Sequence, residues 1–211
     1  MLQRLIAQLD ALVPYLSLAH KDVFQLVAGE YDNWCSGTAT VPFPSNFDAF
    51  SAQVNHSAFV LGYSYFDAFL ADLMRAIYLS RPKMLPNGKK LTFESIIDAG
   101  DYDAVVNKMI EHEVYEAMHG SIPEIQQYFS DKFSIAWPTD NAGELATASL
   151  IRNCIVHNNS LCDARLAKVN GWELNQQICL TTSEVHRYGL AIREVVRHLY
   201  EDASVRHLQR C

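Results

Sequence analysis

The sequence lacks an excess of basic residues. Its 17 Lys and Arg are outnumbered by 24 Asp and Glu, which gives a formal charge of -7 at pH 7. A protein that coats nucleic acid through bulk electrostatics needs concentrated Lys and Arg for its phosphate contacts. That class is excluded, and any contact with nucleic acid must be local.

Long apolar runs are also missing. No window approaches the roughly 18 consecutive apolar residues that a membrane-spanning helix requires. Residues 1–21 lack the basic start, the continuous apolar stretch and the cleavage site of a signal peptide, because Asp10 and Pro14 interrupt them. We therefore expect neither export nor membrane insertion, and a cytoplasmic location.

Cysteines are few and odd in number. A small secreted fold has a dense, paired disulfide framework, which these scattered residues do not form. Reduced thiols in a cytosol fit the pattern better. The five are Cys35, Cys154, Cys162, Cys179 and Cys211.

The apolar fraction of 49% supports a sizeable buried core. We find no internal repeat, low-complexity tract or linker, so a single domain over residues 1–211 is the simplest organisation. The helical periodicity described next predicts an all-α bundle. Its core spans about 47–205, and residues 1–45 form an N-terminal helical extension and a loop.

One long central helix is predicted over Asn46–Ser80. The segment contains no proline and a single glycine. Its large apolar residues recur at spacings of four and three, which makes one stripe suited to the middle of a helical bundle. The stripe consists of Phe59, Tyr63, Phe66, Leu70, Leu73 and Ile77.

Two later helices have a capping-box start. Ser121 with Glu124, and Thr181 with Glu184, have the spacing at which a hydroxyl and a carboxylate satisfy free amides at a helix N-terminus. Periodicity and breaker residues set the other boundaries. The helices predicted after the long one are 91–99, 101–118, 122–133, 141–157 and a final one that begins after residue 181.

A short β-hairpin is predicted near residues 166–174. Asn170 and Gly171 separate two short apolar stretches. Both central positions of a tight primed turn favour such residues, which is why we expect two paired strands here.

The chemistry-bearing residues gather at the end of the helix predicted over 141–157. Arg152, Asn153 and His157 are followed by an unusually polar turn that starts at Asn158. Arginine supplies a permanent charge in a planar fork that fits phosphate oxygens, and histidine exchanges a proton near neutral pH. Together these residues suit work on a phosphodiester.

Helical spacing does not place Arg152, Asn153 and His157 on one face of the helix. At about 100° per residue, His157 lies roughly 140° around the helix from Arg152. Asn153 and His157 are four positions apart and nearly aligned. Either the helix end unwinds, or two chains combine their motifs across an interface.

Arg152 at the edge of a core needs a carboxylate, because a desolvated unpaired charge costs several kcal/mol. Asp67 and Asp72 on the long helix are the candidates. We prefer Asp67, which lies between Phe66 and Leu70 near the middle of that helix. The alternative is that both aspartates are simply solvated, as most aspartates are.

Two similar patterns are set aside. Arg193 and His198 have the same interval as the candidate pair, but they fall on the charged face of the final amphipathic helix. Cys154, His157 and Cys162 fall short of the four ligands that a closed structural zinc site needs. We therefore expect no metal.

The segment Ile151–Asn159 resembles the signature of HEPN domains, in which an arginine and a polar residue, often Asn, precede a histidine. The resemblance extends to Tyr65–Leu73, similar to a helix where related HEPN proteins carry an acidic residue between aromatic positions. It also takes in Gly171–Leu174 and the closing helix. Only the part from Arg152 to His157 is specific.

The resemblance implies an all-α bundle of HEPN type, a homodimer that brings two motifs together, and a metal-independent endoribonuclease of a toxin-antitoxin, abortive-infection or other defence system. It makes Arg152 and His157 the catalytic pair, with Asn153, Asp67 and Asn158 in support. Close relatives often have Glu at the position of Asp67. No cofactor is implied, and an antitoxin or a nucleotidyltransferase would be the partner.

The implied reaction is cleavage of single-stranded RNA through attack by the ribose 2′-hydroxyl. The competing hypothesis is a non-catalytic HEPN module that binds a partner protein or a nucleotide. A third is a plain helical scaffold, in which Arg152 forms a structural ion pair and His157 caps a helix C-terminus. The acidic charge favours the second, and the intact motif favours catalysis.

Overall fold

The computed structural model describes residues 47–86, 92–169 and 171–208, and within these ranges the chain is helical and without strands, as predicted. The extension predicted over 1–45 lies outside them. In the described ranges, every helix is either too short or too polar to pass through a bilayer. The helices are α2 (Phe47–Ser80), α3 (Phe93–Ala99), α4 (Tyr102–Met118), α5 (Ile122–Phe133), α6 (Thr139–His157) and α7 (Thr182–Ala203), with short turns η1 (Pro82–Met84), η2 (Leu166–Lys168) and η3 (Ser204–Leu208).

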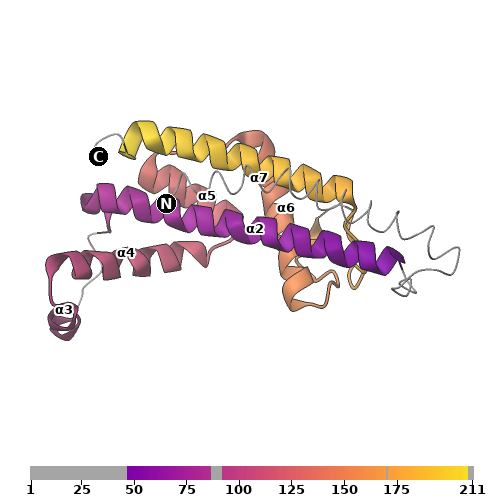
Figure 1. Cartoon of the computed structure of the whole chain (residues 1–211), viewed down its shortest axis with the longest axis horizontal. Coiled ribbons are helices and arrows are strands. Elements are labelled where there is room, and N and C mark those ends of the chain that lie inside the picture. Colours follow the sequence, from indigo (N-terminus) through magenta and orange to yellow (C-terminus); the bar gives the residue numbers. More distant parts are fainter. Residues whose placement is uncertain (1–46, 87–91, 170, 209–211) are drawn as a thin grey trace, which may run out of the picture.

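The long helix α2 is the centre of the arrangement. α7 runs along one side of it and α4 along the other, while α6 crosses it steeply (Figure 1), and α2 contacts all three. Every residue of the apolar stripe predicted for this helix is buried. The predicted central helix is therefore confirmed.

Aromatic rings fill the space where α2 meets α5 and the start of α6. The ring of Phe66 packs edge-on against Tyr63 and Trp137, with centroids 5.8 and 5.9 Å away. Trp137 also contacts Phe129 of α5. Because edge-to-face ring pairs have a preferred geometry as well as a large buried area, they set how α6 enters the bundle.

Both predicted capping boxes are present. The amide of Ser121 donates to Glu124 Oε2 at 2.6 Å, and the amide of Thr181 donates to Glu184 Oε2 at 2.8 Å. These bonds satisfy amides that have no partner inside the helix, so α5 and α7 begin where the sequence predicts.

The predicted hairpin is wrong. Leu166–Lys168 forms a 3₁₀ turn, because Asp163 Oδ1 accepts hydrogen bonds at 2.9 Å from two amides that begin it. Such a local side-chain bond competes with strand pairing. Asn170 lies outside the described residues. In the part of the chain that the structure describes, antiparallel pairing occurs instead as an isolated bridge between Leu161 and Gln177.

Replacing Phe66 by alanine should lower the free energy of unfolding by about 3–5 kcal/mol, because it leaves a cavity in the fully buried aromatic cluster. Urea denaturation of the full chain measures this. Leu61→Ala, on the same helix but 49% exposed, should cost less than about 1 kcal/mol. Equal losses in the two variants would contradict the assigned core.

Candidate functional site

α6 positions the candidate residues at the edge of the core. Its inner face buries Leu145, Ala148 and Ile151 completely, and Arg152 follows directly on that face. The helix stays regular through His157. Of the two arrangements that the sequence leaves open, unwinding of the helix end is therefore not the one adopted.

The turn after α6 is closed by Asn158, which is exposed. Its side-chain amide donates to the carbonyl of Leu161 at 2.7 Å, and the backbone amides of Asn158 and Ser160 both donate to the carbonyl of Cys154. Asn159 and Ser160 have positive φ of 51° and 59°. Such conformations are uncommon outside glycine, and only a well-bonded turn holds two in a row.

Arg152 pairs with Asp67 across the contact between α6 and α2. Its Nη2 lies 3.6 Å from Asp67 Oδ2, and the two side chains are 28% and 33% exposed. Asp72 instead pairs with Arg75 at 2.8 Å. The preference for Asp67 is thus confirmed, although 3.6 Å is too long for a direct hydrogen bond.

Burial changes the ionisation of Asp67. Loss of hydration raises the pKa of its carboxyl to about 6, and the positive charge of Arg152 opposes that rise only in part. Asp67 therefore gains and loses its charge close to neutral pH, and below the pKa it no longer neutralises Arg152.

Asn153 orients the side chain of Arg152 through a hydrogen bond on the surface of α6. Arg152 Nη1 donates to Asn153 Oδ1 at 3.0 Å. Asn153 and His157 are nearly aligned on α6, so this bond draws the guanidinium toward the face that carries His157. His157 itself is exposed at the helix end. One chain therefore brings Asp67, Arg152 and Asn153 together and leaves His157 apart.

Tyr63 and Ser149 also belong to this cluster, although neither is among the site residues predicted from the sequence. The Tyr63 hydroxyl and Arg152 Nε are buried and have no hydrogen-bond partner among the described residues. Burial and then Asp67 raise the pKa of Tyr63, while Ser149 and Arg152 lower it. Ser149 lowers that pKa as a hydrogen-bonding group does, although the Tyr63 hydroxyl forms no hydrogen bond of ordinary distance and angle in the described part of the chain. Helical spacing was the available signal, because Tyr63 precedes Asp67 by one turn and Ser149 precedes Arg152 by one turn.

Neither of the set-aside patterns forms a site. Arg193 and His198 are exposed on α7, and His198 Nε2 contacts the carbonyl oxygen of Ala136 at 3.0 Å. Cys154 and Cys162 are buried free thiols. Among the described residues, no three His, Cys, Asp or Glu side chains are grouped as metal ligands would be.

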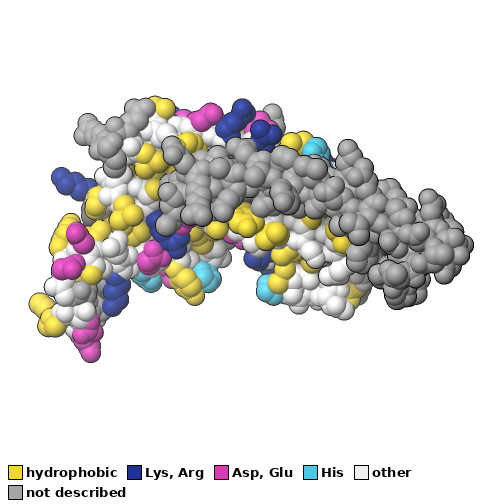
Figure 2. Space-filling view, viewed as in Figure 1, with side chains coloured by type: hydrophobic (Ala, Val, Ile, Leu, Met, Phe, Trp, Pro, Cys, Tyr) yellow, Lys and Arg dark blue, Asp and Glu magenta, His cyan; other side chains and the backbone are white. Residues whose placement is uncertain are grey.

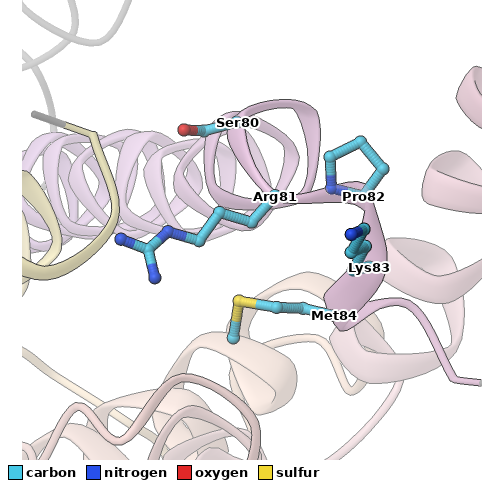
Figure 3. Close-up of a pocket in the computed structure, with 5 residues that line it drawn as sticks. All are labelled: Ser80, Arg81, Pro82, Lys83 and Met84. Carbon is cyan, nitrogen blue, oxygen red and sulfur yellow. The ribbon is translucent and has the colours of Figure 1, made fainter. Parts of the chain in front are cut away.

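A pocket of about 490 Å³ lies at the C-terminal end of α2, lined by Ser80–Met84 (Figure 3). Arg81 extends toward η3, where its Nη2 donates to the carbonyl of Arg206. Ser80 is more than three helical turns from Asp67, about 20 Å along the axis. This pocket is therefore separate from the candidate site.

Comparison of the chain with family models, with curated proteins and with solved structures found no match in any of the three. The HEPN resemblance thus depends on the residues quoted for it, and what it implies enters below as a proposal.

The stability of the protein should fall as pH rises from about 4 to about 6, relative to the Asp67→Asn variant. The folded pKa of about 6 exceeds the ordinary value of 3.8, so in this window the folded state binds more protons than the unfolded state. Urea unfolding across the range measures the difference. Asp131→Asn, an exposed change on α5, controls for the loss of one carboxylate. A difference between wild type and Asp67→Asn that grows in favour of wild type with rising pH would contradict the assignment.

Tyr63→Phe should be at least as stable as the wild type, because a buried hydroxyl without a partner costs about 1–3 kcal/mol. The matched control is Tyr128→Phe. The Tyr128 hydroxyl donates to the buried carboxylate of Glu113 at 2.7 Å, so its removal should destabilise the fold by about 1 kcal/mol or more. Thermal or urea unfolding compares the two. A larger loss in Tyr63→Phe than in Tyr128→Phe would mean that the Tyr63 hydroxyl is bonded in the fold.

Proposed function

We propose that this chain is a HEPN-type, metal-independent endoribonuclease that cleaves single-stranded RNA. The observation that carries the proposal is the half-buried guanidinium of Arg152, which Asp67 anchors and Asn153 turns toward the face of His157. A fixed cationic fork and an exposed imidazole, carried by the same helix, are the two kinds of group that phosphodiester cleavage needs.

In the proposed reaction the ribose 2′-hydroxyl attacks the adjacent phosphorus. His157 moves the proton, and Arg152 stabilises the negative charge that develops on the phosphate oxygens. The bond to the 5′-oxygen breaks, which leaves a 2′,3′-cyclic phosphate and a 5′-hydroxyl. DNA has no 2′-hydroxyl and is not a substrate.

The complete site requires two copies of the chain. Because α6 stays regular, Arg152 and His157 of one chain point about 140° apart and do not meet on one phosphate. A homodimer that joins the ends of two α6 helices brings the arginine of one copy to the histidine of the other. Val156, next to His157, is 47% exposed and supplies an apolar contact for such an interface.

The setting of this activity is a cytoplasmic defence or toxin-antitoxin system, in which an antitoxin or a nucleotidyltransferase restrains the enzyme. This follows from the HEPN resemblance alone.

A non-catalytic HEPN module that binds a protein or a nucleotide is the second candidate. It is favoured by the fact that Arg152 already has two partners, Asp67 and Asn153, as a structural arginine would. The formal charge of -7 favours it too.

His157→Ala should abolish cleavage of a single-stranded oligoribonucleotide and leave the fold unchanged, because His157 is an exposed residue at a helix end. Gel analysis should find 2′,3′-cyclic phosphate products from the wild type, undiminished by EDTA. The matched control is His198→Ala. His198 follows Arg193 on α7 at the same spacing as His157 follows Arg152, and this variant should cut RNA normally.

The proposal fails if purified His157→Ala cuts as fast as the wild type. It fails as well if the wild type leaves RNA intact, or if an oligodeoxyribonucleotide is cleaved equally. Circular dichroism and thermal unfolding of each variant verify that lost activity is not lost structure.

A further inference from the structure

We propose that a recess between α2 and the C-terminal end of α4 binds one base of the RNA strand, an inference that rests on the proposed function. The recess is a pocket of about 400 Å³, lined on one side by Ala71 and Arg75. The last turns of α4, including Tyr115 and Met118, and the following residue His119 line the other side. We call it the α2–α4 recess.

The α2–α4 recess adjoins the candidate site. Asp67, Ala71 and Arg75 follow one another at intervals of four, so they lie along one edge of α2, turning by about 40° at each step. Ala71 is one step beyond Asp67, about 6 Å along the axis. In Figure 2 the surface is hollowed between α4 and the end of α6, with histidine side chains on both sides of the hollow. A strand whose phosphate contacts Arg152 can therefore extend a neighbouring base toward the recess.

An exposed aromatic pair forms one wall of the recess. The ring centroids of Tyr115 and His119 are 3.9 Å apart, and Tyr115 is 60% exposed. His119 Nδ1 contacts the carbonyl oxygen of Tyr115 at 2.7 Å, which orients the imidazole. The two rings are inclined at 48° to each other, so the largely uncovered ring of Tyr115 is the surface on which a base can stack.

The charges in the recess favour a base over a phosphate. Arg75 Nε and Nη2 donate to the two carboxylate oxygens of Glu111 at 2.7 and 2.9 Å, and Arg75 Nη1 donates to Asp72 at 2.8 Å. Its charge is thus balanced by two carboxylates, and its fork is held in place across α2 and α4. The rest of the lining includes the apolar side chains of Ala71 and Met118. An uncharged, flat group fits this environment, whereas the phosphate belongs with Arg152.

The test is binding of a fluorescently labelled, single-stranded 2′-O-methyl oligoribonucleotide to the full chain, measured by anisotropy. The probe has no free 2′-hydroxyl and so cannot be cleaved by the proposed reaction. Tyr115→Ala should raise the Kd at least about fivefold, the usual effect of losing one stacking contact. Tyr115→Phe keeps a stacking ring and should stay within about twofold of the wild type. Tyr102→Ala, at the opposite end of α4 and 73% exposed, is the matched control and should not change the Kd.

The outcomes separate this inference from the ribonuclease proposal. If Tyr115→Ala binds the probe as the wild type does while His157→Ala stops cleavage of ordinary RNA, the base site is wrong and the ribonuclease stands. If Tyr115→Ala weakens binding but ordinary RNA is never cut, the base site stands and the ribonuclease is wrong. A wild-type chain that does not bind the probe overturns the base site. Equal weakening by Tyr115→Ala and Tyr115→Phe also overturns it, because a stacking role needs only the ring.

Discussion

The ion pair between Arg152 and Asp67 is the contact on which the arrangement of the candidate site depends. α6 crosses α2 through apolar surfaces, with Ile151 and Phe66 fully buried beside the pair. Apolar packing alone tolerates small shifts of one helix along another, but a half-buried arginine does not, because a shift would leave a desolvated charge unpaired at a cost of several kcal/mol. The pair therefore favours the observed crossing and keeps the guanidinium of Arg152 close to α2.

Patterns within a few residues correctly predicted the helices, but they gave a wrong prediction for the turn near residues 166–174. The stripe of α2 and the capping boxes of α5 and α7 depend on spacings within a few residues, and each appears as expected. Asp67 was also predictable, because a carboxylate between buried residues in mid-helix must find a cation. The hairpin prediction is wrong because an Asn-Gly dipeptide does not by itself determine the fold around it. The carboxylate of Asp163 accepts hydrogen bonds from the amides of Arg165 and Leu166, which form a 3₁₀ turn just before that dipeptide.

The rest of the site depends on contacts between helices, which the spacing of residues within one helix does not predict. Tyr63 was correctly assigned to the core stripe, but that its hydroxyl has no partner follows from where α6 crosses. The α2–α4 recess likewise depends on how α4 packs beside α2, since residues from both helices line it. Tyr115 gave no signal at all in the sequence, since an exposed tyrosine on a helix is ordinary until its neighbours are known.

The geometry of the ion pair bears on the choice between a structural and a functional arginine. A purely structural arginine gains most from bidentate, hydrogen-bonded contact with its carboxylate. Here the carboxylate is 3.6 Å away, and Arg152 Nε is buried with no hydrogen-bond partner among the described residues. Burial also raises the pKa of Asp67 to about 6, so the carboxylate carries its charge at a cost. A phosphate oxygen that took over the guanidinium would form the short bonds that Asp67 does not, and would let Asp67 bind a proton. The long contact with Asp67 and the raised pKa of that carboxyl therefore favour an arginine that can bind an anion over one whose only role is structural.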